Sequence, residues 1–115
     1  MSNLENYETA YSAYNKALNG INVKENEKIV LECKTFWSYD FALKIPETDI
    51  KNHEQIILEL KNPLFCFYFA KDIPGANIEE HFKAVLNSEN KYWLDLFIKL
   101  INYKGTKIEE WLLYI

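Results

Sequence analysis

One 13-residue phrase occurs twice in this chain, 28 residues apart. It reads FALKIPETDIKNH over residues 41–53 and FAKDIPGANIEEH over residues 69–81, and six of the 13 positions are identical. Two further segments, EKIVLE at residues 27–32 and EQIILE at residues 54–59, are identical at four of six positions. Self-similarity at a fixed period of about 20–50 residues is the signature of repeat architectures. The sequence therefore predicts several copies of one structural unit.

Each copy contains a start signal for an amphipathic helix. A capping residue followed three positions later by glutamate is such a signal, because each side chain bonds a free amide of the first turn. Three such pairs occur, and an aspartate holds the corresponding place in another copy: Asn22 with Glu25, Asn77 with Glu80, Thr106 with Glu109, and Asp49. The apolar residues that follow recur at helical spacing, and Lys, Glu, Asn and Gln fill the other positions. We expect outer helices that bury one face.

Three segments between these helices are apolar nearly all round: TFWSYDFALKI, PLFCFYFAKDI and KYWLDLFIKLI. Their aromatic residues would also suit a strand. Their length of about 10 residues and their lack of alternation favour buried helices. Asn62 and Pro63 resemble a helix start, with asparagine at the cap and proline in the first turn. Pro46 and Pro74 are expected to end two of the buried helices, because an interior proline loses a hydrogen bond and clashes with the preceding turn.

The predicted unit is therefore a pair of helices of about 28 residues, present about three and a half times. The predicted fold class is an all-α, right-handed stack of helical repeats of the α-solenoid kind. One domain spans residues 1–115, with approximate units at 1–21, 22–48, 49–76, 77–105 and 106–115. Each pair would bury its apolar face against the next. Equivalent residues should form an aromatic and an aliphatic ladder: Phe41, Phe69 and Phe97, and Ile50, Ile78 and Ile108.

The phrase FAKDIPGANIEEH resembles the short α-solenoid repeats, the HEAT-like class and the leucine-rich-repeat variant, as they occur in uncharacterised low-GC bacterial or phage proteins. The resemblance covers the chain from about Tyr14 onward. It departs from the longer HEAT unit of about 40 residues. The resemblance implies binding of other macromolecules along one face, and it carries no catalytic residues to transfer.

Composition narrows the possible partners. All 13 basic residues are lysine and the net charge is −4. Arginine is the usual bidentate reader of phosphate and guanine, and a net negative charge repels a polyanion, so nucleic-acid binding is disfavoured. No apolar run approaches the roughly 18 residues of a membrane span, and no secretory signal is evident at the N-terminus. We expect a cytoplasmic protein, bacterial or in the host cytoplasm if phage-encoded, with Cys33 and Cys66 as buried free thiols.

Two repeat-equivalent histidines, His53 and His81, invite a metal-site interpretation. Equivalent positions of stacked helices lie about 8–10 Å apart, which is too far for both nitrogens to reach one zinc ion. We therefore expect both side chains to pack at a half-buried shelf, and removal of His53 to destabilise the fold far less than removal of Phe69. No metal, no cofactor and no catalytic residue is predicted. The paired carboxylates at residues 79–80 and 109–110 are expected in first turns of helices, where a negative charge is stabilised by the positive end of the helix dipole.

The aromatic content exceeds what a small helical core requires. Tyrosine and tryptophan are common anchors of protein interfaces. The chain also closes on IEEWLLYI, whose five consecutive apolar residues cannot all face one neighbour in a helix. We expect a partner-binding edge there, or a homodimer through the C-terminal end. The predicted partner-binding residues are Trp111, Tyr114, Trp93, Tyr92, Glu109 and Glu110.

These observations predict a non-catalytic module that binds a partner protein and occludes its working surface. Lysine, asparagine, isoleucine and tyrosine are abundant, which is typical of an AT-rich coding sequence. This bias and the small size suit a mobile-element inhibitor of the anti-defence or anti-CRISPR type, or an immunity protein against a toxin. The alternative is a nucleic-acid-binding helical-repeat protein that uses a lysine face. No group of residues supports an enzyme, and no membrane association is expected.

Overall fold

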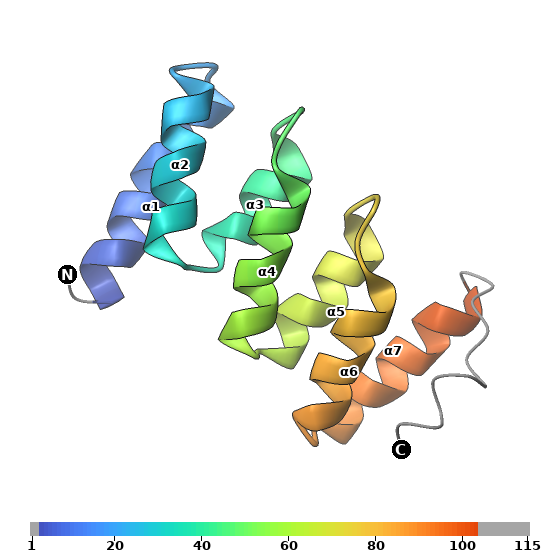
Figure 1. The fold of residues 1–115 in the computed structure, drawn as a ribbon. Helices are drawn as coiled ribbons and strands as arrows, with labels where there is room; N and C mark the ends of the chain where they lie inside the picture. The colour runs from blue at the N-terminus through green and yellow to red at the C-terminus, as the bar shows by residue number, and fades with distance from the viewer. Residues whose placement is uncertain (1–2, 104–115) are drawn as a thin grey trace. The chain divides into compact units, whose positions relative to one another are not determined.

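The computed structural model describes residues 3–103, and within this range the chain forms seven α-helices and no strand (Figure 1). The three apolar segments are helical, so the all-α prediction is confirmed for the described residues. None of the helices in this range has the length and apolar character needed to cross a membrane. The helices are α1 (Asn3–Leu18), α2 (Val23–Cys33), α3 (Trp37–Lys44), α4 (Ile50–Leu60), α5 (Pro63–Asp72), α6 (Ile78–Asn87) and α7 (Lys91–Tyr103).

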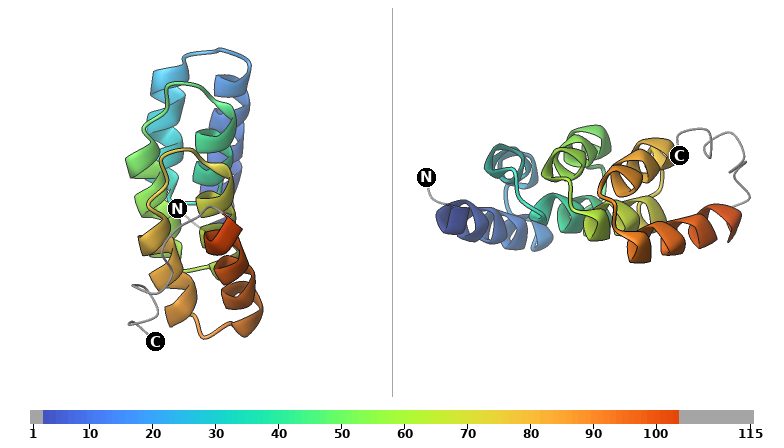
Figure 2. Two further views of the ribbon diagram at one scale, coloured as in Figure 1. Left: turned by 90° about the vertical axis from the view of Figure 1, so that its right-hand side faces the viewer. Right: turned by 90° about the horizontal axis from the view of Figure 1, so that it is seen from below.

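The chain divides after Leu60 into two compact units, called here the N-terminal unit (α1–α4) and the C-terminal unit (α5–α7). In the N-terminal unit, α1 and α2 pack as an antiparallel hairpin, and α3 contacts α1, α2 and α4 (Figures 1 and 2). Small buried residues on one face of α1 allow this close approach: Ala10, Ala13 and Ala17. The core beside them contains Tyr14, Val30, Phe41 and Ile45.

The C-terminal unit is built around aromatic side chains from its three helices. Phe82 of α6 meets Phe97 of α7 with ring centroids 5.7 Å apart, and Phe67 of α5 meets Phe97 at 6.0 Å. Both contacts are edge-to-face, the geometry that aromatic quadrupoles favour. Cys66 and Val85 are fully buried around them. Each helix of this unit contacts the other two.

Three of the predicted helix starts form as expected. The Asn77 side chain accepts from the Glu80 amide at 3.3 Å, and Asp49 accepts from the Asn52 amide at 3.3 Å. Asn62 accepts from Leu64 N at 3.0 Å, with proline in the first position of α5. The cap predicted at Thr106 lies outside the described residues.

The capping box predicted at Asn22 is wrong. Its backbone adopts the left-handed conformation (φ 41°, ψ 56°), whereas a capping residue is normally extended, and its side chain makes no cap bond. The turn is held instead by Asn26, whose Nδ2 donates to the carbonyls of Ile21 at 2.9 Å and Asn22 at 3.1 Å. A buried side-chain amide one turn into α2 therefore replaces the expected cap.

This difference between two asparagines is testable. Asn77→Ala should destabilise the protein by about 1 kcal/mol, because it removes an acceptor of a first-turn amide. Asn22→Gly should have no destabilising effect, because its side chain caps nothing and glycine suits a positive φ. Urea unfolding of both variants measures the difference. Equal losses would contradict this account of the two helix starts.

Pro46 and Pro74 end their helices through the same turn. Ile45 and Ile73 precede them with φ/ψ of −104°/124° and −102°/116°, the extended conformation that a following proline imposes. Each isoleucine amide still donates to the carbonyl four residues back, at 3.0 and 3.1 Å. The two copies of the repeated phrase thus build the same local structure.

Left-handed residues recur with the period of the sequence. Gly20, Glu47 and Gly75 have positive φ in the turns between α1 and α2, α3 and α4, and α5 and α6. A second series follows the second helix of each pair: Lys34, Lys61 and Glu89. Within each series the residues are 27 and 28 positions apart. A positive φ costs a non-glycine residue about 1 kcal/mol or more, so its recurrence indicates a turn that tertiary packing enforces.

Burial bears on the two predicted ladders. Phe41, Phe69 and Phe97 are each fully buried, and their alignment in one ladder stays a prediction. Ile50 and Ile78 are half-buried, and Ile108 lies outside the described residues. The expectation that the apolar helices are the deeper ones holds best for α5, whereas α3 and α7 leave large side chains exposed.

The half-buried shelf predicted for the histidines is wrong, because His53 and His81 are 0% exposed. Each imidazole stacks on a phenylalanine from its own phrase, Phe41 or Phe69, with ring centroids 5.1 Å apart in both cases. A neutral imidazole can be buried in this way without the cost of burying a charge.

Candidate protein-binding surface

Four aromatic side chains of the N-terminal unit form one group, called here the Trp37 cluster: Tyr7, Tyr11 and Tyr14 of α1 and Trp37 of α3. The Trp37 ring lies 5.5 Å from Tyr7, 4.9 Å from Tyr11 and 5.3 Å from Tyr14, centroid to centroid. The tyrosines share one face of α1 because they are spaced by four and three residues. Trp37 meets them from the first turn of α3.

The cluster is buried at one end and open at the other. Tyr14 is 5% exposed and also contacts Phe41, which ties the cluster to the core. Burial raises the pKa of the Tyr14 hydroxyl, and the negative charge of Asp40 raises it further. Tyr7 and Tyr11 remain 48% and 47% exposed. These two rings therefore pack against Trp37 on one side and expose large amphipathic surfaces to solvent on the other.

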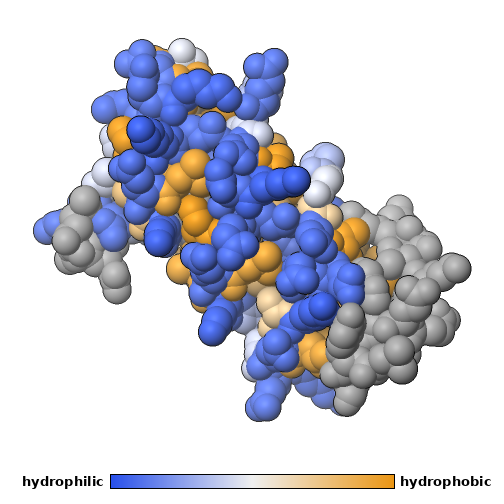
Figure 3. All heavy atoms as spheres, in the orientation of Figure 1, coloured by the Kyte–Doolittle hydropathy of each residue, from blue (hydrophilic) through white to orange (hydrophobic). Residues whose placement is uncertain are grey.

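The unit that carries this cluster holds the whole net charge of the protein. Residues 1–60 contain six lysines and ten acidic residues, which gives −4, whereas residues 61–115 contain seven of each. The surface over α2 and α4 is mainly hydrophilic, with smaller hydrophobic areas between (Figure 3). A partner of the N-terminal unit therefore meets a unit that is negatively charged overall.

The C-terminal unit contains two of the predicted partner-binding residues, the sequence neighbours Tyr92 and Trp93, and their rings are in contact. Tyr92 is 66% exposed and lies edge-on to the half-buried Trp93, with centroids 5.1 Å apart. Trp93 also contacts Phe67 at 5.6 Å and Tyr68 at 5.9 Å, and Lys71 lies over the Tyr68 ring. Trp93 is thus anchored to the unit, and Tyr92 is the exposed member of the pair.

The other predicted partner-binding residues, and with them the predicted C-terminal edge, lie outside the described residues. They are Trp111, Tyr114, Glu109 and Glu110.

His53 belongs to a buried polar contact that links α2 to α4. Its Nε2 lies 3.0 Å from Oε2 of Glu27, and the same oxygen accepts the Asp49 amide at 2.8 Å. Glu27 is 6% exposed, and Lys24 approaches its other oxygen at 3.8 Å. A buried carboxylate that accepts two bonds is satisfied without full exposure to water. The contact therefore fixes the start of α4 against α2.

The protonation state of His53 follows from its surroundings. Nε2 donates to Glu27, and Nδ1 is buried without a hydrogen-bond partner among the described residues. Burial lowers the pKa of the imidazole, and its bond to Glu27 and the nearby negative charges oppose part of that shift. Within residues 3–103, no group of three or more His, Cys, Asp or Glu side chains is placed to hold a metal ion. The arrangement is that of a neutral structural histidine.

The two cysteines are buried free thiols. Burial raises the pKa of the Cys66 thiol to about 12, and burial together with the charge of Glu32 raises that of Cys33. Because the thiolate is the reactive form, both residues are poor nucleophiles in the folded protein.

Alkylation measures this directly. At pH 8, a thiol pKa of about 12 leaves roughly a thousandfold less thiolate than an ordinary cysteine has, so iodoacetamide should modify Cys66 very slowly in the native state. In urea both cysteines should react at the rate of a free thiol. Equal rates for Cys66 in native and unfolded protein would contradict its burial.

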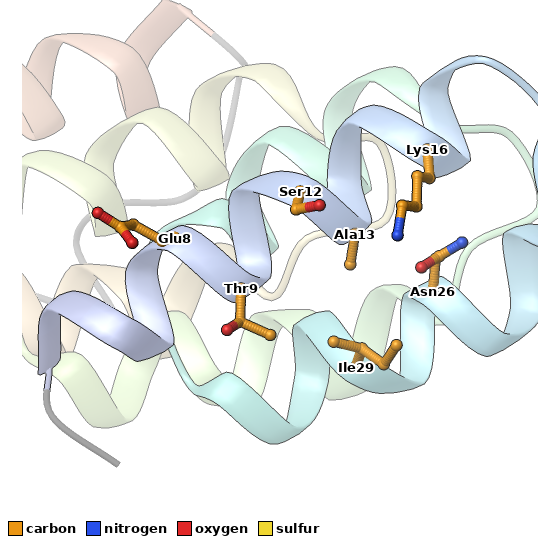
Figure 4. Close-up of a pocket in the computed structure, with 7 residues that line it drawn as sticks. All are labelled: Glu8, Thr9, Ser12, Ala13, Lys16, Asn26 and Ile29. Carbon is orange, nitrogen blue, oxygen red and sulfur yellow. The ribbon is translucent and has the colours of Figure 1, made fainter.

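A groove of about 310 Å³ lies between α1 and α2. Lys16 and Asn26 point toward one another across it, and Glu8, Thr9 and Ser12 lie along its α1 side (Figure 4). Binding sites for small molecules are usually enclosed and mainly apolar with a few convergent polar groups. This groove is open rather than enclosed, and its lining mixes charged, polar and apolar side chains.

Sequence reasoning missed Tyr7, Tyr11 and the bond between Glu27 and His53. The signal for the tyrosines is their spacing with Leu4, Tyr14 and Leu18, which follows an alternation of three and four residues. No local signal identifies the Glu27 contact, because its partner lies 26 residues away.

No family model, no curated protein and no solved structure matches this chain.

Proposed function

We propose that the chain is a non-catalytic protein-binding module, and that the Trp37 cluster is its main contact with the partner. The observation that carries the proposal is the half-exposure of Tyr7 and Tyr11 beside a tryptophan that holds both rings. Tyrosine and tryptophan supply large contact areas at a low cost in conformational entropy, and they dominate the energetics of many interfaces.

The proposal includes a helical-repeat architecture. It is supported by the identical turns before Pro46 and Pro74, by the left-handed residues that recur every 27–28 positions, and by the two equivalent Phe–His stacks. In repeat proteins each unit packs on its neighbours, and the series of units creates an extended binding surface. Such a module acts by covering the working surface of its partner, as an anti-CRISPR or other anti-defence inhibitor or a toxin-immunity protein does.

Nucleic-acid binding is the weaker alternative. The N-terminal unit is acidic, the C-terminal unit is neutral, and the chain contains no arginine. Phosphate contacts dominate nucleic-acid affinity and require a concentrated positive charge. A mobility shift with oligonucleotides that weakens steeply with salt would favour this alternative over protein binding.

A paired-variant capture experiment tests the proposal. The tagged protein should retain one stoichiometric protein from a lysate of the organism that encodes it, and Tyr7→Ser with Tyr11→Ser should abolish that retention. Both side chains are half-exposed, so the variant should fold normally by circular dichroism. Tyr92→Ser is the matched control, because it removes an exposed tyrosine from the other unit.

The control separates two outcomes. If Tyr92→Ser loses the captured protein and the Tyr7 and Tyr11 variant keeps it, the binding surface lies on the C-terminal unit. Retention that survives all three substitutions would contradict an aromatic binding surface on the described residues.

A further inference from the structure

The exposed face of α1 has the pattern of a helix-pairing seam. Leu4, Tyr7, Tyr11, Tyr14 and Leu18 are separated by three, four, three and four residues. This is the alternation by which one helix packs along another in a coiled coil. Four of the five side chains are 47–66% exposed, and Tyr14 alone is buried. The seam runs about 21 Å along the helix, the length of two heptads.

The seam is held in shape before any partner binds. Tyr7 and Tyr11 lie against Trp37, and Tyr14 lies against Trp37 and Phe41. These contacts restrict the rotamers of the rings, which lowers the entropy lost on binding. A rigid apolar stripe on a helix suits a second helix with its own stripe, as in the helix-in-groove mode of recognition.

The charge beside the seam limits which helix fits. Glu8 is exposed one residue after Tyr7, and Asp40 of α3, which has Lys44 near it, lies close enough to raise the pKa of Tyr14. The N-terminal unit as a whole has a net charge of −4. Complementary potentials favour association, and like charges oppose it by several kcal/mol. A second copy of this chain would bring two such acidic surfaces together, so self-pairing through this seam is disfavoured.

We propose that the α1 seam binds an amphipathic helix of the partner protein that carries an apolar stripe flanked by lysine or arginine. This inference rests on the proposed function and adds the chemical class of the partner segment. The apolar stripe of that helix packs on Leu4, Tyr7, Tyr11 and Leu18, and its basic flank faces Glu8. The cation also gains from the tyrosine rings, whose faces attract positive charge.

A peptide selection tests the inference without knowledge of the partner. The probe is a display library of two-heptad helical peptides with leucine at the seam positions and an equal mixture of lysine and glutamate at the flanking positions. Selection on the full-length protein should enrich lysine-flanked peptides about tenfold over glutamate-flanked ones. The preference should weaken at 0.5 M salt, which screens exposed charges.

Two variants locate the effect. Tyr7→Ser with Tyr11→Ser should remove the enrichment, and Glu8→Lys should reduce the preference for lysine several-fold. Glu25→Lys makes the same charge change at an exposed position of α2 and should leave most of the preference intact.

The peptide selection tests the class of the partner segment, whereas the capture experiment tests the binding surface, so the two can fail separately. Enrichment of glutamate-flanked peptides, or enrichment that the tyrosine variant retains, would overturn the inference. So would the recovery of no peptide. If the same tyrosine variant still loses the captured protein, the module binds proteins through this surface and the partner segment is of another kind. If capture does not depend on the tyrosines, the proposed surface itself is wrong.

Discussion

Phe41→Ala is expected to destabilise the protein by about 3–5 kcal/mol, the range for removal of a buried aromatic side chain from a core. Phe41 is fully buried, and it touches three parts of the N-terminal unit. It contacts Tyr14 of α1 at 6.4 Å, stacks on His53 of α4 at 5.1 Å, and lies in the core cluster with Val30 of α2. A loss of this size is a large part of the 5–15 kcal/mol that stabilises a typical domain.

Leu43→Ala is the matched control for this prediction. It lies on the same short helix and is 39% exposed, so its loss should stay below about 1 kcal/mol. Urea unfolding followed by circular dichroism measures both values. Similar losses for the two variants would show that Phe41 is not at the centre of the unit.

His53→Ala is expected to cost a similar amount, about 3–5 kcal/mol, because it removes a large buried side chain and one hydrogen bond of the buried Glu27 carboxylate. It also opens a cavity beside Phe41, on which the imidazole stacks. The smaller effect expected for a half-buried packing residue does not apply to a side chain that is 0% exposed. Lys51→Ala, an exposed substitution on the same helix, should be close to neutral.

The same histidine predicts a dependence of stability on pH. The pKa of His53 is lowered in the folded state, so the unfolded chain takes up a proton first as the pH falls. The stabilisation is therefore complete above about pH 6.5, the usual histidine value, and declines as the pH falls toward the folded pKa. The slope should approach about 1.4 kcal/mol per pH unit for one proton.

His53→Gln isolates this contribution, because His81 is present in both proteins. The free energy of unfolding of the wild type should fall more steeply than that of the variant between pH 6.5 and 5. Parallel pH profiles would show that His53 titrates normally, which its burial does not allow.

Local signals in the sequence were sufficient for much of the fold. Asn62 with Pro63 starts α5, and Ile73 before Pro74 ends it, because both effects depend on neighbouring residues alone. The left-handed turn at Asn22 was not predictable in this way, because it is stabilised by Asn26 one turn later. Repetition of a phrase predicted repetition of a turn, which the backbone angles at Ile45 and Ile73 confirm.

The candidate surface was harder to predict than the helices. Residue type alone suggested Tyr92 and Trp93, and the structure shows that only Tyr92 of this adjacent pair is largely exposed. The contact of Tyr7 and Tyr11 with Trp37 was not predictable, because it joins α1 to α3, which lie about 30 residues apart in the chain. Residue type identifies a possible anchor, but exposure and long-range contacts decide which aromatic residues remain available to a partner.

Hydroxyl-radical footprinting of the complex with the captured protein tests the binding surface most directly, because it reads the exposure of tyrosine and tryptophan side chains one by one. We expect the oxidation rates of Tyr7 and Tyr11 to fall several-fold on binding, while that of Tyr92, which is 66% exposed in the free protein, stays unchanged. Unchanged rates at Tyr7 and Tyr11 in a stoichiometric complex would contradict the assignment of the partner to the Trp37 cluster.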